Sequence, residues 1–84
     1  MSLLDLPNLG ETTRARLEEV GIRNRRQLER VGPAGAYQRL VAVAGRRIPV
    51  CYYLYALDAA LRGVDWRSLS DREKAELRRQ AGVD

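Results

Sequence analysis

Glycines divide this sequence at nearly regular intervals into segments of helical length. The dividing residues are Gly10, Gly21, Gly32, Gly45, Gly63 and Gly82. Glycine commonly follows the last turn of a helix, and proline is favoured in the first turn. Pro33 and Pro49 stand near segment starts, and no stretch alternates apolar and polar residues as a strand does. The sequence therefore predicts an all-α fold, a compact domain of about five short helices.

Local signals place the ends of these helices. Asn24 is a favoured N-cap residue and Gln27 stands three positions later, while Ser70 and Glu73 repeat that spacing as a capping box. Short turns between short helices favour antiparallel or crossing neighbours. The predicted helices span residues 11–20, 25–31, 33–44, 49–62 and 71–80.

The fourth predicted helix, residues 49–62, is apolar over most of its circumference. Only Asp58 and Arg62 carry charge, and they stand four residues apart. A helix of this kind is usually central and buried. We expect Trp66, in the following connector, to pack over its end, and Cys51 to fill the core rather than to react.

Histidine is absent from the 84 residues, and Cys51 is the only cysteine. Catalytic triads that need histidine and His–Cys metal clusters therefore cannot be built. We expect a non-enzymatic protein with no catalytic residue, no metal and no cofactor.

The length of the chain accommodates one domain, predicted to span residues 1–84. A lone cysteine forms no internal disulfide and fits a reducing compartment. The N-terminus lacks the pattern of a signal peptide, and the longest uncharged run, residues 48–57, is far shorter than a membrane span. We expect a cytoplasmic protein with no membrane partner.

Positive charge is concentrated in the first half of the chain. The net charge is +4, but residues 14–47 hold nine arginines and three glutamates, whereas the charges of residues 48–84 balance. This distribution is compatible with an anionic partner. The competing interpretation is an ordinary solvated surface.

The segment Leu6-Pro7-Asn8-Leu9-Gly10 precedes the first predicted helix. A tight turn that opens into a helix N-terminus presents backbone N–H groups to anions. The segment resembles the hairpin of helix-hairpin-helix DNA-binding modules, which implies that Asn8, Leu9 and Gly10 contact a phosphate. Asn8 stands where that pattern has glycine, and Glu11 would repel a phosphate. A turn that only caps the helix is an equal alternative.

Arginines surround the start of the second predicted helix. Arg23, Arg25 and Arg26 lie where the helix dipole disfavours cations, and Arg14 is expected nearby. These four arginines are candidates for nucleic-acid binding. The alternative is that they pair with nearby glutamates on a solvated face.

Three aromatic residues, Tyr52, Tyr55 and Trp66, are candidates for a protein-interaction surface. Tyrosine and tryptophan are frequent in interfaces. Stacking with single-stranded bases is a weaker alternative. Core packing competes with both, and exposure of Tyr52 and Tyr55 would decide the question.

The chain as a whole resembles the C-terminal domain of the TfoX/Sxy family, regulators of competence for DNA transformation. Its most specific match is the run Tyr55-Ala56-Leu57-Asp58-x-Ala60-Leu61-x-Gly63 followed three residues later by Trp66. The Leu-Pro-x-Leu-Gly start and Gln27 to Gly32 match as well. The resemblance implies an all-helical domain with a helix-hairpin-helix-like element and no catalytic residues. Family members often carry an N-terminal domain as well, which we expect this chain to lack.

Two functions follow from these features. The first is a non-catalytic regulatory module that acts through protein–protein contacts in transcription regulation. The resemblance implies a transcription regulator, or an N-terminal TfoX-type domain on another chain, as its partner. The second is a low-specificity module that binds the phosphates of DNA weakly. The oligomeric state stays open.

Overall fold

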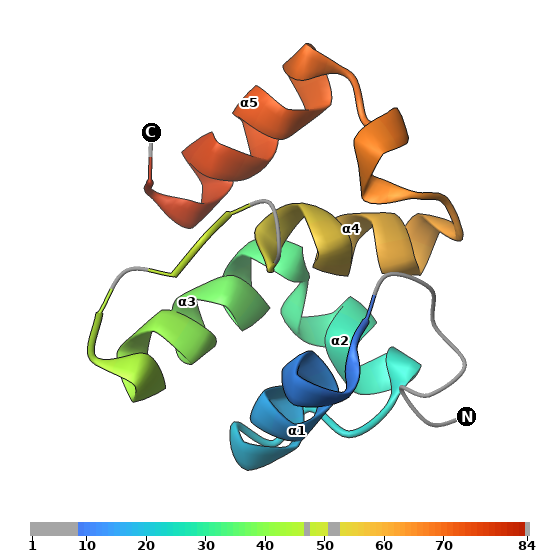
Figure 1. The fold of residues 1–84 in the computed structure, drawn as a ribbon. Coiled ribbons are helices and arrows are strands. Elements are labelled where there is room, and N and C mark those ends of the chain that lie inside the picture. Colours follow the sequence, from blue (N-terminus) through green and yellow to red (C-terminus); the bar gives the residue numbers. More distant parts are fainter. Residues whose placement is uncertain (1–8, 47, 51–52, 84) are drawn as a thin grey trace.

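The computed structural model describes residues 9–46, 48–50 and 53–83. Its elements are α1 (Glu11–Glu19), α2 (Arg25–Val31), α3 (Pro33–Ala44), α4 (Leu54–Arg62), the short 3-10 helix η2 (Trp66–Ser68) and α5 (Asp71–Ala81) (Figure 1). No strand occurs in these ranges, and the predicted all-α fold is confirmed. The predictions on Asn8, Cys51 and Tyr52 fall outside the described residues.

The N-caps of α2 and α5 form as the sequence predicts, but the reciprocal capping-box contact forms only in α5. The Gln27 side chain accepts from the backbone N–H of Arg23 instead of that of Asn24. The Asn24 side chain accepts a hydrogen bond from the backbone N–H of Gln27 at 2.9 Å. Ser70 and Glu73 form a complete capping box, each side chain accepting from the backbone N–H of the other. These caps satisfy N–H groups that a helix start would otherwise leave unpaired.

Gly32 sets the boundary between α2 and α3. Its φ of +83° lies in the left-handed region, where residues with a Cβ are strained. The chain can therefore leave α2 and enter α3, which begins at Pro33, without an intervening loop. The predicted bounds of both helices are confirmed.

The predicted start of the fourth helix is wrong, because α4 begins at Leu54 rather than at Pro49. The carbonyl of Ile48, which would accept the first hydrogen bond of a helix starting at Pro49, accepts one from the buried hydroxyl of Tyr37 at 2.5 Å. Ile48 itself is buried. The contact with Tyr37 of α3 therefore keeps Ile48 from acting as the N-cap of a helix that starts at Pro49.

Helix α4 is the centre of the core, as its composition predicts. It packs against α3, α5 and η2, and Figure 1 shows α5 on one side of it and α1–α3 on the other. Burying one leucine or isoleucine side chain stabilises a fold by about 1.5–3 kcal/mol. The largest fully buried side chains are Tyr37, Leu17, Ile22, Leu28, Leu54 and Leu57.

The helices are short. The longest described one, α3, has 12 residues, whereas a membrane-spanning helix needs about 20. Among the described residues, no helix has the length and apolar character to cross a bilayer.

Candidate nucleic-acid interface

The described part of the predicted hairpin is Leu9 and Gly10, directly before α1. The Leu9 side chain is buried, and Gly10 is the N-cap of α1 without a side-chain cap. The Arg14 guanidinium donates to the Leu9 carbonyl at 3.1 Å and is partly buried. Arg14 therefore holds the turn against the helix, and Glu11 occupies the first turn where an anion would bind.

Arg25 also has a structural role. Its Nε donates to Glu29 Oε1 at 2.7 Å, and its Nη2 donates to the carbonyl of Leu61 at 3.0 Å. The second bond joins α2 to the last turn of α4, where carbonyl groups lack partners within the helix. Of the four predicted arginines, Arg14 and Arg25 thus serve the fold.

Arg23 and Arg26 remain available to solvent. Both are exposed, and their guanidinium groups form no ion pair or hydrogen bond within the described ranges. The backbone N–H of Arg23 donates to the Gln27 side chain at 2.6 Å, which fixes the turn into α2. An open pocket of about 380 Å³ lies beside Arg26 and is also lined by Asn24, Arg25 and Glu29.

A further arginine, Arg30, belongs with this pair. It is exposed, stands one turn after Arg26, and lacks an ion pair in the part of the chain that the structure describes. We call Arg23, Arg26 and Arg30 the α2 basic face. Arg30 is not among the site residues predicted from the sequence, although its four-residue spacing from Arg26 on a predicted helix was a sufficient signal.

The α2 basic face is electrostatically unfavourable for the isolated domain. Arg26 lies in a first turn that contains no acid, and the one glutamate of α2, Glu29, is held by Arg25. Cations near a helix N-terminus and like charges at i, i+4 each destabilise a helix by a few tenths of a kcal/mol. A ligand that supplies negative charge would relieve both effects.

Comparison with known proteins places the chain in a family. The family model described as the TfoX C-terminal domain matches residues 1–81. The chain belongs to the TfoX C-terminal domain family. The TfoX C-terminal domain family is not a known enzyme family.

Two crystal structures of Listeria monocytogenes proteins share the TfoX C-terminal fold of this chain. One, titled as an uncharacterized protein in a triclinic form, is 33% identical with a TM-score of 0.80, covering 93% of this chain and 86% of that one. The other, titled as a protein of unknown function in a tetragonal form, is 28% identical with a TM-score of 0.81, covering 95% and 98%. Their titles assign no activity. No curated protein matches the sequence.

In this TfoX C-terminal domain, Tyr55 belongs to the core, which is the interpretation that competed with an aromatic interaction surface. Tyr55 is buried, with its ring stacked on Trp66 at a centroid distance of 6.3 Å and its hydroxyl accepting a hydrogen bond from Arg78 at 2.6 Å. The Lys74 ammonium lies 5.8 and 5.6 Å from the two ring centroids. The predicted aromatic surface fails at Tyr55 because the chain after α4 folds back and covers it with the half-buried Trp66.

Several carboxyl groups of the domain have lowered pKa values, and each has a structural cause. Hydrogen bonds from the Arg67 side chain and backbone lower the pKa of Asp65 from 3.8 to about 2. The Ser70 N–H and hydroxyl lower the pKa of Glu73, and Arg79 lowers the pKa of Glu76. All three shifts favour the ionised form, whereas a general acid at neutral pH needs a raised pKa. In the described ranges, no group of three metal-ligating side chains occurs.

Proposed function

We propose that this domain is a non-catalytic regulatory module that binds the phosphate backbone of nucleic acid weakly, through the α2 basic face. The observation that carries the proposal is the set of three exposed arginines, Arg23, Arg26 and Arg30, without acidic partners among the described residues. Membership of the TfoX family supports a regulatory role, which the resemblance connects to competence for DNA transformation.

Arginine suits this task because its planar guanidinium binds phosphate oxygens with two parallel hydrogen bonds. Arg26 and Arg30 are separated by about 6 Å along the helix axis. A DNA duplex carries one negative charge per about 1.7 Å of its axis. Both side chains can therefore meet phosphates at the same time.

Binding of this kind does not read the base sequence. Specific recognition uses amide and guanidinium groups at base edges in the grooves. The amide side chains nearest to the α2 basic face, Asn24 and Gln27, are both engaged in capping α2. We therefore expect similar affinity for duplexes of unrelated sequence.

A protein-contact function at the predicted aromatic surface has weaker support. The burial of Tyr55 removes the centre of that surface. A transcription regulator or an N-terminal TfoX-type domain remains a proposed partner, and it would bind elsewhere on the domain.

Fluorescence anisotropy of a labelled duplex at increasing salt tests the nucleic-acid proposal. With three phosphate contacts, the logarithm of the binding constant should fall against the logarithm of the salt concentration with a slope of about −2.7. Affinity should then drop about 40-fold between about 50 and 200 mM salt.

The matched variants are Arg26→Glu and Arg72→Glu. Both arginines are exposed and occupy the second position of a helix, α2 or α5, so both substitutions change the net charge and the helix dipole equally. Arg26→Glu should weaken binding about tenfold and reduce the slope by about 1 or more, whereas Arg72→Glu should change affinity far less. Equal effects of the two variants, or no binding at about 0.1 mM protein in low salt, would overturn the proposal.

A further inference from the structure

The open pocket beside the α2 basic face, which we call the α2 pocket, is lined by Asn24, Arg25, Arg26 and Glu29. Its volume of about 380 Å³ is more than ten times the roughly 30 Å³ that a water molecule occupies in the liquid, so a phosphate group fits. Two of the four lining residues are arginines, which bind phosphate oxygens by paired hydrogen bonds. The pocket therefore holds two groups that attract a phosphate and one, Glu29, that repels it.

The fold positions Arg25 at this pocket. Its Nη2 donates to the carbonyl of Leu61 at 3.0 Å, which ties the guanidinium to the last turn of α4. The side chain is still 42% exposed. A guanidinium has five N–H donors, and Leu61 and Glu29 take two of those of Arg25 in the described structure. A ligand in the pocket would therefore meet a side chain that is already ordered, which lowers the entropic cost of binding.

Glu29 occupies Arg25 in the way that a phosphate would. Its Oε1 accepts a hydrogen bond from Nε of Arg25 at 2.7 Å, and carboxylates and phosphates both bind guanidinium groups through their oxygens. The Glu29 side chain is 53% exposed, and ion pairs at such exposed positions contribute little to stability. Glu29 therefore lies where it competes with a ligand, while the bond from Arg25 to Leu61 can hold the arginine without it.

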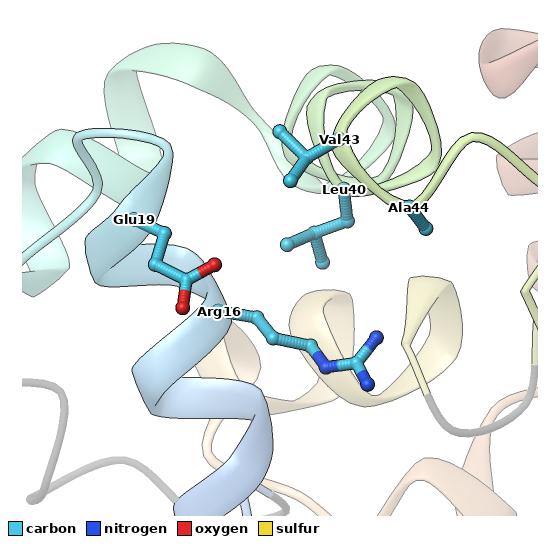
Figure 2. A pocket seen from close by; sticks show the side chains of 5 residues that line it. All are labelled: Arg16, Glu19, Leu40, Val43 and Ala44. Atoms are coloured by element: carbon cyan, nitrogen blue, oxygen red, sulfur yellow. The ribbon is translucent and has the colours of Figure 1, made fainter.

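The pocket between α1 and α3 also contains one arginine and one glutamate, but its lining is different. It is lined by Arg16, Glu19, Leu40, Val43 and Ala44 (Figure 2). Among the described residues, no ion pair joins Arg16 to Glu19, and the Arg16 guanidinium lies 5.9 Å from the centre of the Tyr53 ring. This pocket offers a phosphate one arginine and mostly apolar walls. The α2 pocket, with two arginines, is the better equipped of the two for an anion.

We propose that the α2 pocket binds one backbone phosphate of nucleic acid between Arg25 and Arg26, and that Glu29 lowers the affinity by competing for Arg25. This inference rests on the proposed function, because the α2 basic face brings the nucleic acid to the pocket. It gives Arg25 a second role beside its bond to Leu61. Glu29 then acts as a built-in competitor that keeps the binding weak.

Duplex anisotropy with Glu29→Ala tests the competition. The substitution removes the competing carboxylate, and alanine suits the interior of a helix. We expect the affinity to rise about tenfold at about 50 mM salt, with a salt slope steeper by about 0.9, so that the gain shrinks to about threefold at about 200 mM. A purely structural role of Glu29 would not raise the affinity. Thermal unfolding checks that the variant is folded.

Glu76→Ala is the matched control. Glu76 of α5 is 46% exposed and accepts from Arg79 of the same helix at 2.7 Å. Its removal changes the net charge equally and also frees an arginine, but outside the α2 pocket. The affinity should therefore change less than about twofold, because salt screens distant charges. A gain from Glu29→Ala no larger than that from Glu76→Ala would overturn the competition.

The same titrations separate this inference from the proposed function. If the parent protein binds the duplex through Arg26 and Glu29→Ala brings no gain, the competition is wrong and the proposed function stands. If the parent and both variants fail to bind at about 0.1 mM protein in low salt, the proposed function is wrong and the competition falls with it.

Proton–nitrogen correlation spectra of the arginine Nε–H groups test the role of Arg25 directly. The signal that is absent from the spectrum of Arg25→Ala identifies this residue. In Glu29→Ala, added duplex should shift the Arg25 signal together with that of Arg26. In the parent the Arg25 signal should move far less, because Glu29 holds its Nε. An Arg25 signal that stays in place in Glu29→Ala while the affinity rises would show that Arg25 does not bind the phosphate.

Discussion

Most arginines of the α4–α5 region, residues 54–81, are bonded to another side chain, whereas most arginines of α2 are not. Between positions 62 and 79, four of five arginines bond to another side chain: Arg62 to Asp58 and Glu73, Arg67 to Asp65, Arg78 to Tyr55, and Arg79 to Glu76. On α2, the described arginines that point outward have no acidic partner, and only Arg25 is paired. The same residue type therefore stabilises one region and is proposed to serve binding in the other.

Among the substitutions that distinguish the two regions, Arg78→Ala should have the largest effect on the free energy of unfolding. The Arg78 guanidinium is partly buried and donates to the hydroxyl of the buried Tyr55. Hydrogen bonds that involve a charged group contribute about 1.5–3 kcal/mol, so we expect Arg78→Ala to lower the free energy of unfolding by about 2 kcal/mol. Urea denaturation measures this loss, and duplex affinity of the folded variant should change little beyond the effect of one lost charge. A loss below about 0.5 kcal/mol would show that Arg78 behaves as an ordinary surface residue.

The second-largest effect on stability should distinguish two neighbouring residues, Arg25 and Arg26. Arg25→Ala removes the bond to the Leu61 carbonyl and the ion pair with Glu29, and should cost about 1 kcal/mol, or about 4–8 °C in melting temperature. Arg26→Ala removes no intramolecular partner in the described structure and should leave the melting temperature within about 2 °C while weakening duplex binding. Thermal unfolding and anisotropy on both variants check the contrast, and it fails if Arg26→Ala destabilises the domain as much as Arg25→Ala does.

This contrast shows where sequence analysis stops. The caps at Asn24 and Ser70 were predictable because each involves residues within one turn. The roles of Arg25 and Arg26 were not, because the carbonyl that holds Arg25 belongs to Leu61, 36 residues away in sequence. The start of α4 was mispredicted for a similar reason, since the bond between Tyr37 and Ile48 spans 11 residues.

The candidate site, like the fold, was predictable from the sequence only in part. The excess of positive charge in residues 14–47 indicated the part of the chain that contains the α2 basic face, and helical spacing could have added Arg30. Which arginines remain exposed depends on how the helices pack. The burial of Tyr55 also depends on packing, because Trp66 reaches it only after the chain turns at the end of α4.

A smaller effect should arise from the like-charge pair of the α2 basic face. Arg26→Gln removes the repulsion between Arg26 and Arg30 and also takes a cation out of the first turn of α2, so it should raise the free energy of unfolding by about 0.2–0.5 kcal/mol at low salt. The gain should shrink at high salt, because screening already weakens the repulsion there. The same variant should weaken duplex binding. Denaturation at two salt concentrations measures the gain, and a loss of stability instead would mean that Arg26 supports the fold.

The smallest effect on stability is expected from the titration of Glu73 at the start of α5. The hydrogen bonds from Ser70 and the nearby Arg62 lower the pKa of Glu73 below its ordinary value of 4.5. The folded state therefore favours the carboxylate, and this contribution is complete above about pH 4.5 and lost as the pH falls through the lowered pKa. Glu73→Gln keeps an oxygen that can accept from the Ser70 N–H but does not titrate. The parent should melt above this variant at pH 7, and the difference should shrink by pH 3. An equal difference at both pH values would mean that the charge of Glu73 contributes nothing.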